Sequence, residues 1–180
     1  MLTIEEEQAI VNDILSGNKE RYAVIVKEYQ STVASLCYKL VGNKLDIDEV
    51  TQQVFIELYT ALPRFRHASR LSTFMYRITV NVISKMLKHD RRFVSYDQEI
   101  PHIGTGTLPS HEEQLIKEEQ RRKLHEAIGR LKHEQRTALV LYTFEDFSYQ
   151  QIADVMQCSL SKVESLIFRA KKNLAKEIKQ

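Results

Sequence analysis

Apolar residues recur every three or four positions along most of the chain, a spacing that places them on one side of an α-helix. Only five glycines and three prolines interrupt this pattern. We therefore predict an all-α protein. In the first half, the predicted helices run from a cap at Thr3 to about Gly17, from about Lys19 to Val41, from Asp46 to Leu62, and from about Ser72 to a point between Lys88 and Arg92.

The helical spacing is lost between residues 93 and 110, which hold two of the three prolines and two of the five glycines. This composition is typical of a flexible linker. We predict two small helical domains, residues 1–92 and 111–180, joined by the linker 93–110. Helices are expected in the second domain at about 112–131, 134–144, 148–156 and 159–178.

The last two of these helices have the form of a helix-turn-helix. Ser148 and Gln151 have the spacing of a capping box at the start of the shorter helix, and Ser159 can cap the longer one. Only Gln157 and Cys158 separate the two helices, which is the short turn that this DNA-binding motif requires.

The longer helix is expected to turn Val163, Ile167, Ala170 and Leu174 inward. Its outward row would then be Ser161, Lys162, Ser165, Phe168, Arg169 and Lys172, followed by Lys176. In a DNA major groove, Phe168 could contact a thymine methyl group while Arg169 contacts guanine or a phosphate. The alternative is ordinary surface charge, with Phe168 touching a neighbouring helix.

The first domain presents a second polar row. The helix beginning near Ser72 is expected to expose Thr73, Arg77, Asn81, Ser84 and Lys88, with Phe65, Phe74 and Tyr76 nearby. Donors, cations and aromatic rings at this spacing suit a nucleic-acid strand whose bases are unstacked. Because aromatic residues at helical spacing more often belong to a core, we expect Phe74 to be partly buried. We rank Tyr76, Arg77 and Asn81 above it as contact residues.

The helix from Asp46 to Leu62 carries one apolar residue outside its core stripe. The stripe contains Ile47, Val50, Val54, Leu58 and Leu62. Glu49, Gln52, Gln53 and Ile56 lie on the opposite side. An isoleucine on a polar face often marks a surface that binds a partner, although a scattered apolar surface residue is the alternative.

Charge and composition exclude several classes of protein. The 26 basic and 24 acidic residues leave a net charge of only +2, so affinity for nucleic acid must come from clustered charges. Two distant cysteines predict neither a disulfide framework nor a zinc site. The sequence has no phosphate-binding loop and no metal-binding or catalytic motif, so we expect no enzyme activity, cofactor, metal or small-molecule substrate. Without a signal peptide or membrane span, a cytoplasmic protein is expected.

Three segments, in order, resemble a bacterial sigma factor of the extracytoplasmic-function group: DEVTQQVFIELYTALPRF from Asp48, FRHASRLSTFMYRITVN from Phe65, and LKHEQRTALVLYTFEDFSYQQIADVM from Leu131. The resemblance covers nearly the whole chain. It implies a specificity subunit whose first domain binds the core enzyme of RNA polymerase and melts and reads the minus-ten promoter element. The second domain would read the minus-thirty-five element, and an anti-sigma factor is an expected further partner.

The resemblance assigns a role to each polar row. Polymerase binding is expected at Asp48, Glu49, Gln52, Gln53 and Ile56. Minus-ten binding is expected at Arg66, Phe74, Tyr76, Arg77, Asn81, Ser84 and Lys88. Minus-thirty-five binding is expected at Ser161, Lys162, Glu164, Ser165, Phe168, Arg169 and Lys172.

The sequence also departs from the family pattern. Phe74 stands where the family usually has tryptophan, and Gln157 where it has glycine; Glu164 and Leu166 stand where basic residues are common. The promoter sequence therefore cannot be copied from relatives. The alternative function is a helix-turn-helix regulator that binds duplex DNA without joining polymerase. It would explain residues 148–176 but not residues 48–81.

Overall fold

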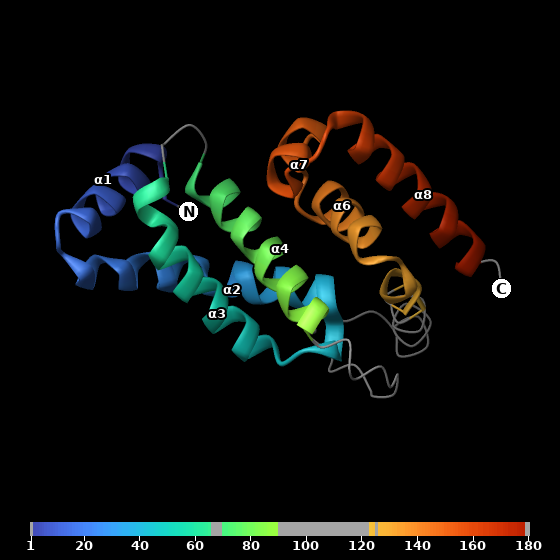
Figure 1. Ribbon diagram of the computed structural model, residues 1–180, viewed down its shortest axis with the longest axis horizontal. Coiled ribbons are helices and arrows are strands. Elements are labelled where there is room, and N and C mark those ends of the chain that lie inside the picture. Colours follow the sequence, from blue (N-terminus) through green and yellow to red (C-terminus); the bar gives the residue numbers. More distant parts are fainter. Residues whose placement is uncertain (1, 66–69, 90–122, 125, 179–180) are drawn as a thin grey trace, which may run out of the picture.

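The computed structural model describes residues 2–65, 70–89, 123–124 and 126–178 (Figure 1). The α-helices are α1 (Ile4–Leu15), α2 (Tyr22–Val41), α3 (Ile47–Ala61), α4 (Leu71–His89), α6 (His133–Phe144), α7 (Tyr149–Met156) and α8 (Leu160–Ile178). Short 3-10 helices lie between α1 and α2 (Lys19–Arg21), between α2 and α3 (Gly42–Lys44) and between α3 and α4 (Leu62–Arg64). Residues 126–130 are also helical. No strand occurs in these ranges, and the predicted all-α class is confirmed.

Local capping explains why three helices begin where the sequence predicts. Thr3 and Glu6 form a reciprocal capping box at α1, with the backbone N–H of Thr3 donating to Glu6 Oε2 at 2.7 Å. Ser148 and Gln151 form the same arrangement at α7. At α3, the carboxylate of Asp46 accepts two backbone N–H groups of the first turn. Each cap satisfies donors that a helix start leaves without partners.

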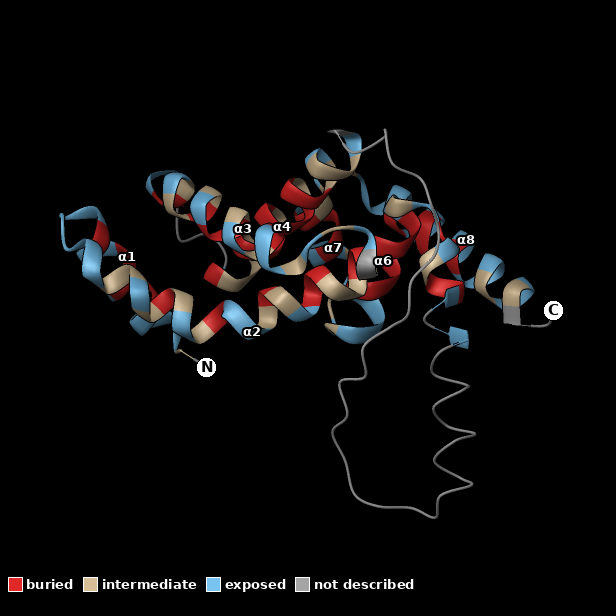
Figure 2. Cartoon of the chain, turned by 90° about the horizontal axis from the view of Figure 1, so that it is seen from below, coloured by how far each residue is buried: buried red, intermediate tan, exposed pale blue. Residues whose placement is uncertain are grey.

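Helix α4 lies at the centre of the molecule. Its apolar residues Leu71, Met75, Ile78 and Val82 are buried, and the helix packs on α2 and α3. Val80, on another side of the helix, is also buried. This second buried side exists because α7, from the C-terminal half, packs on α4 as well (Figures 1 and 2).

The two halves of the chain share a core. Helix α6 packs on α2, and α7 packs on α4. Ile152 and Val155 of α7 belong to the same buried cluster as Leu36, Cys37 and Leu40 of α2. The sequence predicts two domains and a linker, but the hydrophobic pattern contains no information about this packing.

Glu145, just after α6, makes two short polar contacts between the halves. Its Oε1 accepts a hydrogen bond from Lys39 Nζ at 2.7 Å, and its Oε2 accepts one from the Tyr76 hydroxyl at 2.5 Å. The Tyr76 ring lies 4.8 Å from the Phe147 ring. Burial, reinforced by the Glu145 carboxylate, raises the pKa of Tyr76, so its hydroxyl stays protonated and remains a donor.

The guanidinium of Arg136 joins the C-terminal half to the end of α2. The residue is 5% exposed, and its Nη1 donates to the Leu40 carbonyl at 2.6 Å. Its Nε donates to the Ile128 carbonyl at 3.1 Å, and its Nη2 donates to the carbonyls of Gly129 and Leu131. A cation is favourable here because helix C-termini carry unpaired carbonyls and partial negative charge.

Replacing Arg136 with methionine should lower the free energy of unfolding by about 3 kcal/mol, because several buried carbonyls lose their donor. Chemical denaturation monitored by circular dichroism measures this change. Arg130→Met is the matched control, since the Arg130 side chain is 57% exposed and its ion pair with Glu177 is at the surface. The control should cost less than about 1 kcal/mol. Equal effects would contradict the role of Arg136.

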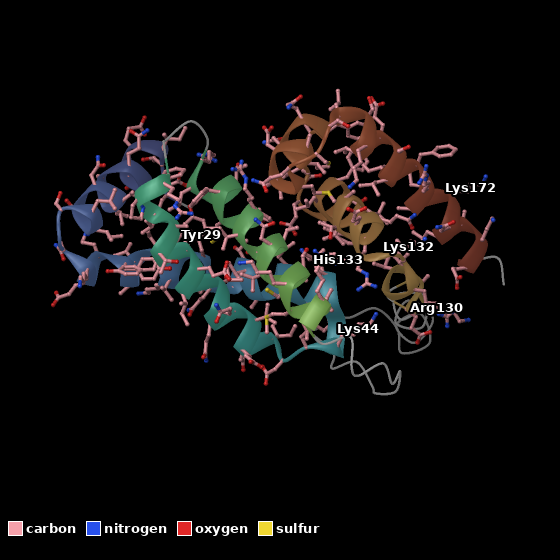
Figure 3. The ribbon with its side chains drawn as sticks, viewed as in Figure 1. Tyr29, Lys44, Arg130, Lys132, His133 and Lys172 are labelled. Atoms are coloured by element: carbon pink, nitrogen blue, oxygen red, sulfur yellow. The ribbon has the colours of Figure 1, made fainter. Side chains whose placement is uncertain are left out.

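The contact between α4 and α6 should weaken in acid. His133 Nε2 lies 3.0 Å from Ser84 Oγ (His133 is labelled in Figure 3). Burial lowers the pKa of His133 below its ordinary 6.5; Arg136 and Lys44 act in the same direction, while Glu134 opposes them. The unfolded chain therefore takes up a proton first as the pH falls.

The histidine contribution to stability is thus complete above about pH 6.5 and decreases below it. Thermal unfolding of the wild type and of His133→Gln, compared between pH 7.5 and pH 5.5, checks this. The variant should lose less stability over that range than the wild type. An unchanged pH dependence would show that other groups cause it.

Candidate nucleic-acid and partner surfaces

The outer row of α3 is open to solvent. Asp48, Glu49 and Gln52 are exposed, Gln53 is half-buried, and Ile56 is 58% exposed. The opposite side of α3 is buried in the core, as its apolar stripe predicts. Ile56 therefore presents an uncovered branched apolar side chain among polar groups, which is a suitable centre for a contact with another protein.

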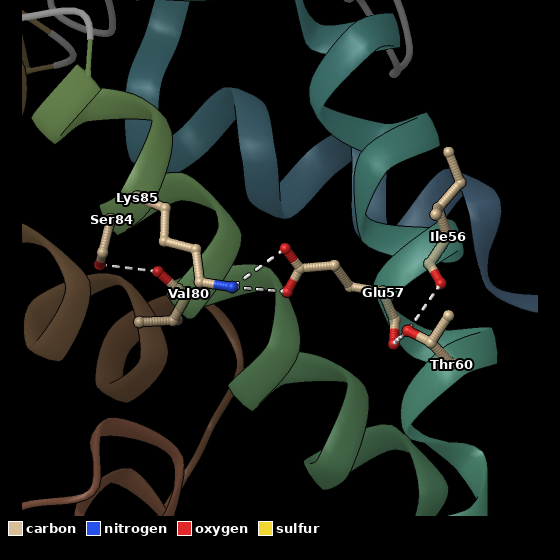
Figure 4. A network of polar contacts seen from close by, with 6 residues as sticks. All are labelled: Ile56, Glu57, Thr60, Val80, Ser84 and Lys85. Carbon is tan, nitrogen blue, oxygen red and sulfur yellow. Dashed lines mark hydrogen bonds and ion pairs between the residues drawn. The ribbon is translucent and has the colours of Figure 1, made fainter.

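Helix α3 is also tied to α4 at the surface. Lys85 Nζ lies 3.0 Å and 3.1 Å from the two carboxylate oxygens of Glu57 (Figure 4). In the same view, the Ile56 side chain points away from this ion pair. Because the pair is largely exposed, it contributes little energy, and the buried packing sets the angle between α3 and α4.

The polar row of α4 is partly covered. Thr73, Arg77, Asn81 and Ser84 are half-buried, and Lys88 is exposed. Ser84 faces His133 of α6, as described above. Within the described chain, Arg77 Nε is buried and has no hydrogen-bond partner. Arg66 lies outside the described residues. The C-terminal half thus occupies part of the surface that the sequence predicts for a nucleic-acid strand.

The two aromatic residues near this row differ in exposure. Tyr76 is 7% exposed beneath Phe147, whereas Phe74 is half-buried and lies 5.3 Å from the ring of Phe65. Phe74 is thus partly buried, as the sequence predicts, and it is more accessible in this arrangement than Tyr76, which ranks above it among the expected contact residues. Tyr76 is less exposed because the C-terminal half covers it, and the position of that half cannot be read from the local sequence.

An open pocket lies where the two halves meet near the start of α4. Arg70, Thr73 and Tyr76 line one side, and Glu145 and Phe147 line the other. Sequence reasoning missed Glu145 because its partners Lys39 and Tyr76 lie far away along the chain. Nothing in the surrounding sequence distinguishes it from a solvated carboxylate.

The predicted row on α8 is exposed over its whole length. Ser161, Lys162, Glu164, Ser165, Phe168, Arg169 and Lys172 are all solvent-facing. Phe168 is 67% exposed, and its ring does not rest on a neighbouring helix. Lys162 Nζ lies 2.8 Å from Glu134 Oε1, in a surface ion pair that raises the pKa of Lys162. Lys172 is labelled in Figure 3.

Two departures from the family pattern have structural consequences. Leu166 is 7% exposed and packs into the core, so this position does not face a ligand. Glu164 is exposed. In the turn before α8, Gln157 has φ 51° and ψ 50°, the left-handed conformation that favours glycine. The turn geometry is retained with a residue that adopts it at a cost.

Among the residues that the structure describes, no group of His, Cys, Asp and Glu side chains is arranged to hold a metal ion. Over the same ranges, no helix combines the length and the apolar character needed to cross a membrane.

Comparisons with known families agree with this geometry. The family model for Sigma-70 region 2 matches residues 25–93, which include the polar rows of α3 and α4. The model for Sigma-70, region 4 matches residues 121–174, which include α7 and most of α8. Two thirds of the chain therefore match sigma-factor regions, in the order that the sequence predicts.

Curated relatives and solved structures extend the likeness over nearly the whole chain. The RNA polymerase sigma-H factor of Pseudomonas aeruginosa is 32% identical, covering 99% of this chain and 96% of that one. The ECF RNA polymerase sigma-E factors of Haemophilus influenzae and Escherichia coli (strain K12) are each 31% identical to this chain. Each alignment covers 96% of this chain, and they cover 95% and 94% of the two relatives, respectively.

Two solved structures share the fold. CnrH, solved with the cytosolic domain of CnrY, has a TM-score of 0.67 at 20% identity and covers 96% of this chain and 97% of its own. The sigma factor RpoE of Bartonella quintana, solved with the anti-sigma factor NepR, has a TM-score of 0.68 at 19% identity. The match covers 88% of this chain and 96% of RpoE. This chain belongs to the bacterial sigma-70 family, as an RNA polymerase sigma factor of the extracytoplasmic-function group.

Proposed function

We propose that this sigma factor divides its work among three helix surfaces. The outer row of α3 binds the polymerase core enzyme, the row of α4 binds the minus-ten element, and the row of α8 binds the minus-thirty-five element. One observation carries the proposal. Phe168 and Ile56 are the two most exposed large hydrophobic residues that the structure describes, and each lies at the centre of a predicted polar row.

The α3 surface suits a protein partner. A branched apolar side chain surrounded by carboxylates and amides can fill a pocket while the polar groups form the rim of the interface. Asp48, Glu49, Gln52 and Gln53 form that rim around Ile56. The core of the N-terminal half holds α3 on its other side, so the surface is rigid before binding.

The α4 surface suits a melted strand. The chain uses no fuel, so bases leave the duplex only if their contacts with protein offset the cost of unpairing. Stacking on an aromatic ring contributes about 1–3 kcal/mol per base. Phe74 and Tyr76 are the stacking candidates, while Arg77, Asn81 and Ser84 hold phosphates and base edges. Lys88 extends this surface at the end of α4, and Arg66, which lies outside the described residues, is a further proposed contact.

The α8 surface suits the major groove of duplex DNA. Phe168 contacts a thymine methyl group, and Arg169 contacts guanine or a phosphate. Lys162, Lys172 and the hydroxyl groups of Ser161 and Ser165 bind the backbone. Glu164 accepts a hydrogen bond from cytosine or reduces phosphate affinity locally.

The two halves separate when the chain binds a promoter. The minus-ten and minus-thirty-five elements are about 25 base pairs apart, or about 85 Å along B-form DNA at 3.4 Å per pair. In the packed arrangement, α6 and α7 contact α2 and α4 directly. Ser84 and Tyr76 become available to DNA only after His133, Glu145 and Phe147 have left them. The predicted linker 93–110 supplies the chain length for this separation.

An anti-sigma factor that binds the packed arrangement would keep the minus-ten surface covered. The Bartonella quintana sigma factor that shares this fold was solved with an anti-sigma factor. The chain itself supplies specificity and no catalysis, and it acts in the cytoplasm with the polymerase.

Reconstitution tests the proposed function. Bacterial core polymerase and the purified chain are incubated with a promoter library, and the 5′ ends of the transcripts are sequenced. Specific initiation that depends on the added chain supports the proposal. If the chain binds duplex DNA but never directs initiation, the alternative regulator function is correct instead.

Ile56→Asp should weaken core-polymerase binding at least about tenfold, because a charge replaces the apolar centre of the surface. Asn81→Ala should leave core binding intact and reduce promoter opening, since its side chain belongs to the minus-ten surface. Fluorescence anisotropy measures the first, and permanganate reactivity of thymines in the promoter measures the second. Ile4→Asp is the control for Ile56, because Ile4 is 46% exposed on a different helix. Equal loss of both activities in both variants would contradict the division of surfaces.

Arg169→Ala should weaken binding to the minus-thirty-five duplex by about 1–3 kcal/mol if its guanidinium contacts a guanine. Lys171→Ala is the matched control on the same helix. The ammonium group of Lys171 lies 4.8 Å from the centre of the Tyr142 ring and is thus directed toward α6. Titration of the holoenzyme with labelled promoter DNA at fixed salt measures both. Similar losses would reduce Arg169 to a contributor of general surface charge.

A further inference from the structure

Helix α1 contributes a buried carboxylate to the start of α4. Glu7 is 3% exposed, and it is the one acidic side chain that is buried among the described residues. It lies before residue 25, where the match to Sigma-70 region 2 begins. Burying a carboxylate costs free energy unless its oxygens are hydrogen-bonded. The hydrogen-bond partners of Glu7 therefore indicate what this side chain does.

Both oxygens of Glu7 have partners on different helices. Oε1 accepts a hydrogen bond from the Tyr29 hydroxyl of α2 at 2.7 Å (Tyr29 is labelled in Figure 3). Oε2 accepts one from the backbone N–H of Leu71, the first residue of α4, at 2.9 Å. Burial and this carboxylate together raise the pKa of Tyr29, so its hydroxyl remains a donor. Glu7 therefore joins α1, α2 and α4 at one point.

The contact with Leu71 gives the start of α4 an acceptor that the Arg70 side chain does not supply. Helix starts usually obtain a side-chain acceptor from Ser, Thr, Asp or Asn at the preceding position, and Arg70 has none to offer. The first N–H groups of a helix carry partial positive charge, and a carboxylate satisfies them well. Glu7 supplies this acceptor from a residue 64 positions away along the chain.

The first turns of α4 carry the proposed minus-ten contacts. Thr73, Phe74, Tyr76 and Arg77 all lie within two turns of Leu71. A shift or fraying of this helix start would move these side chains relative to the rest of the N-terminal half. Because ring stacking and base-edge hydrogen bonds depend on position, such a displacement weakens them more than it weakens the core.

We propose that Glu7 is a positioning residue for minus-ten recognition: through its hydrogen bonds to Leu71 and Tyr29 it holds the start of α4, and with it the strand-binding side chains, without touching DNA itself. This inference rests on the proposed function of the α4 row. It gives α1 a part in promoter recognition, although α1 carries none of the predicted contact residues.

The test compares Glu7→Leu with Glu7→Gln in the complete holoenzyme. Glutamine retains one acceptor for the Leu71 N–H, and its amide can donate to the Tyr29 oxygen, so both contacts can persist. Leucine retains neither. The readout is the affinity for a labelled single-stranded oligonucleotide carrying the non-template minus-ten sequence recovered by reconstitution. We expect Glu7→Leu to bind about tenfold more weakly and Glu7→Gln to stay within about threefold of the wild type.

Tyr22→Phe is the matched control for lost stability. The Tyr22 hydroxyl donates to the Phe55 carbonyl at 2.6 Å, so this variant also loses a tyrosine hydrogen bond between helices, but at α3. It should lower the melting temperature without changing oligonucleotide affinity. Core-polymerase affinity is measured for every variant as a check on folding, and the Glu7 variants should retain it.

Three outcomes overturn the inference: unchanged oligonucleotide affinity in Glu7→Leu, an equal loss in Glu7→Gln, or a parallel loss of core binding, which would indicate a general structural role. Arg77→Ala and Asn81→Ala separate this from the proposed function. If they leave oligonucleotide affinity unchanged, the assignment of the α4 row is wrong. If they lower it while Glu7→Leu does not, only the role of Glu7 is wrong.

Discussion

The buried guanidinium of Arg136 sets how the two halves of this sigma factor meet. It donates to the Leu40 carbonyl near the end of α2 and to the carbonyls of Ile128 and Leu131. One side chain therefore satisfies carbonyl groups at two helix ends that would otherwise be buried without donors. With α6 held against α2, Glu145 reaches Lys39 and Tyr76. The covering of α4 by the C-terminal half therefore follows from a contact made elsewhere in the molecule.

Two partners consequently compete for one side of α4. The first is the C-terminal half of the chain, through α7 and the groups that follow α6, and the second is the melted DNA strand that we propose binds there. An intramolecular partner has a high effective concentration, so promoter DNA must offer more contacts than the C-terminal half does. The surfaces proposed for polymerase and for the minus-thirty-five element remain open in this arrangement. Such an arrangement favours association with polymerase and duplex DNA before strand binding, because only the strand-binding surface requires the halves to part.

Periodicity and capping are local, and they account for what could be predicted. They located the helices of the described ranges, the capping boxes at Thr3 and Ser148, and the polar rows whose centres, Ile56 and Phe168, are exposed. The predicted linker 93–110 and the first part of the helix predicted at about 112–131 lie outside the described residues. The contacts of Glu7 and Arg136 could not be predicted, because their partners lie 64 and 96 residues away and no spacing rule connects them. The low exposure of Tyr76 was missed for the same reason. The fold within each half was thus predictable, whereas the packing between the halves, which governs access to α4, was not.

The two cysteines differ in a way that has a practical use. Cys37 is fully buried in α2, and burial raises the pKa of its thiol to about 11, so almost no thiolate forms near neutral pH. Cys158, in the turn that precedes α8, is only half-buried; burial raises the pKa of its thiol too, so access to solvent is what distinguishes the two cysteines. Alkylating reagents react with thiolate and need access to it, so a maleimide dye should attach to Cys158 of the folded wild-type chain alone. The protein thus carries a natural labelling position beside α8, without the need to replace any residue.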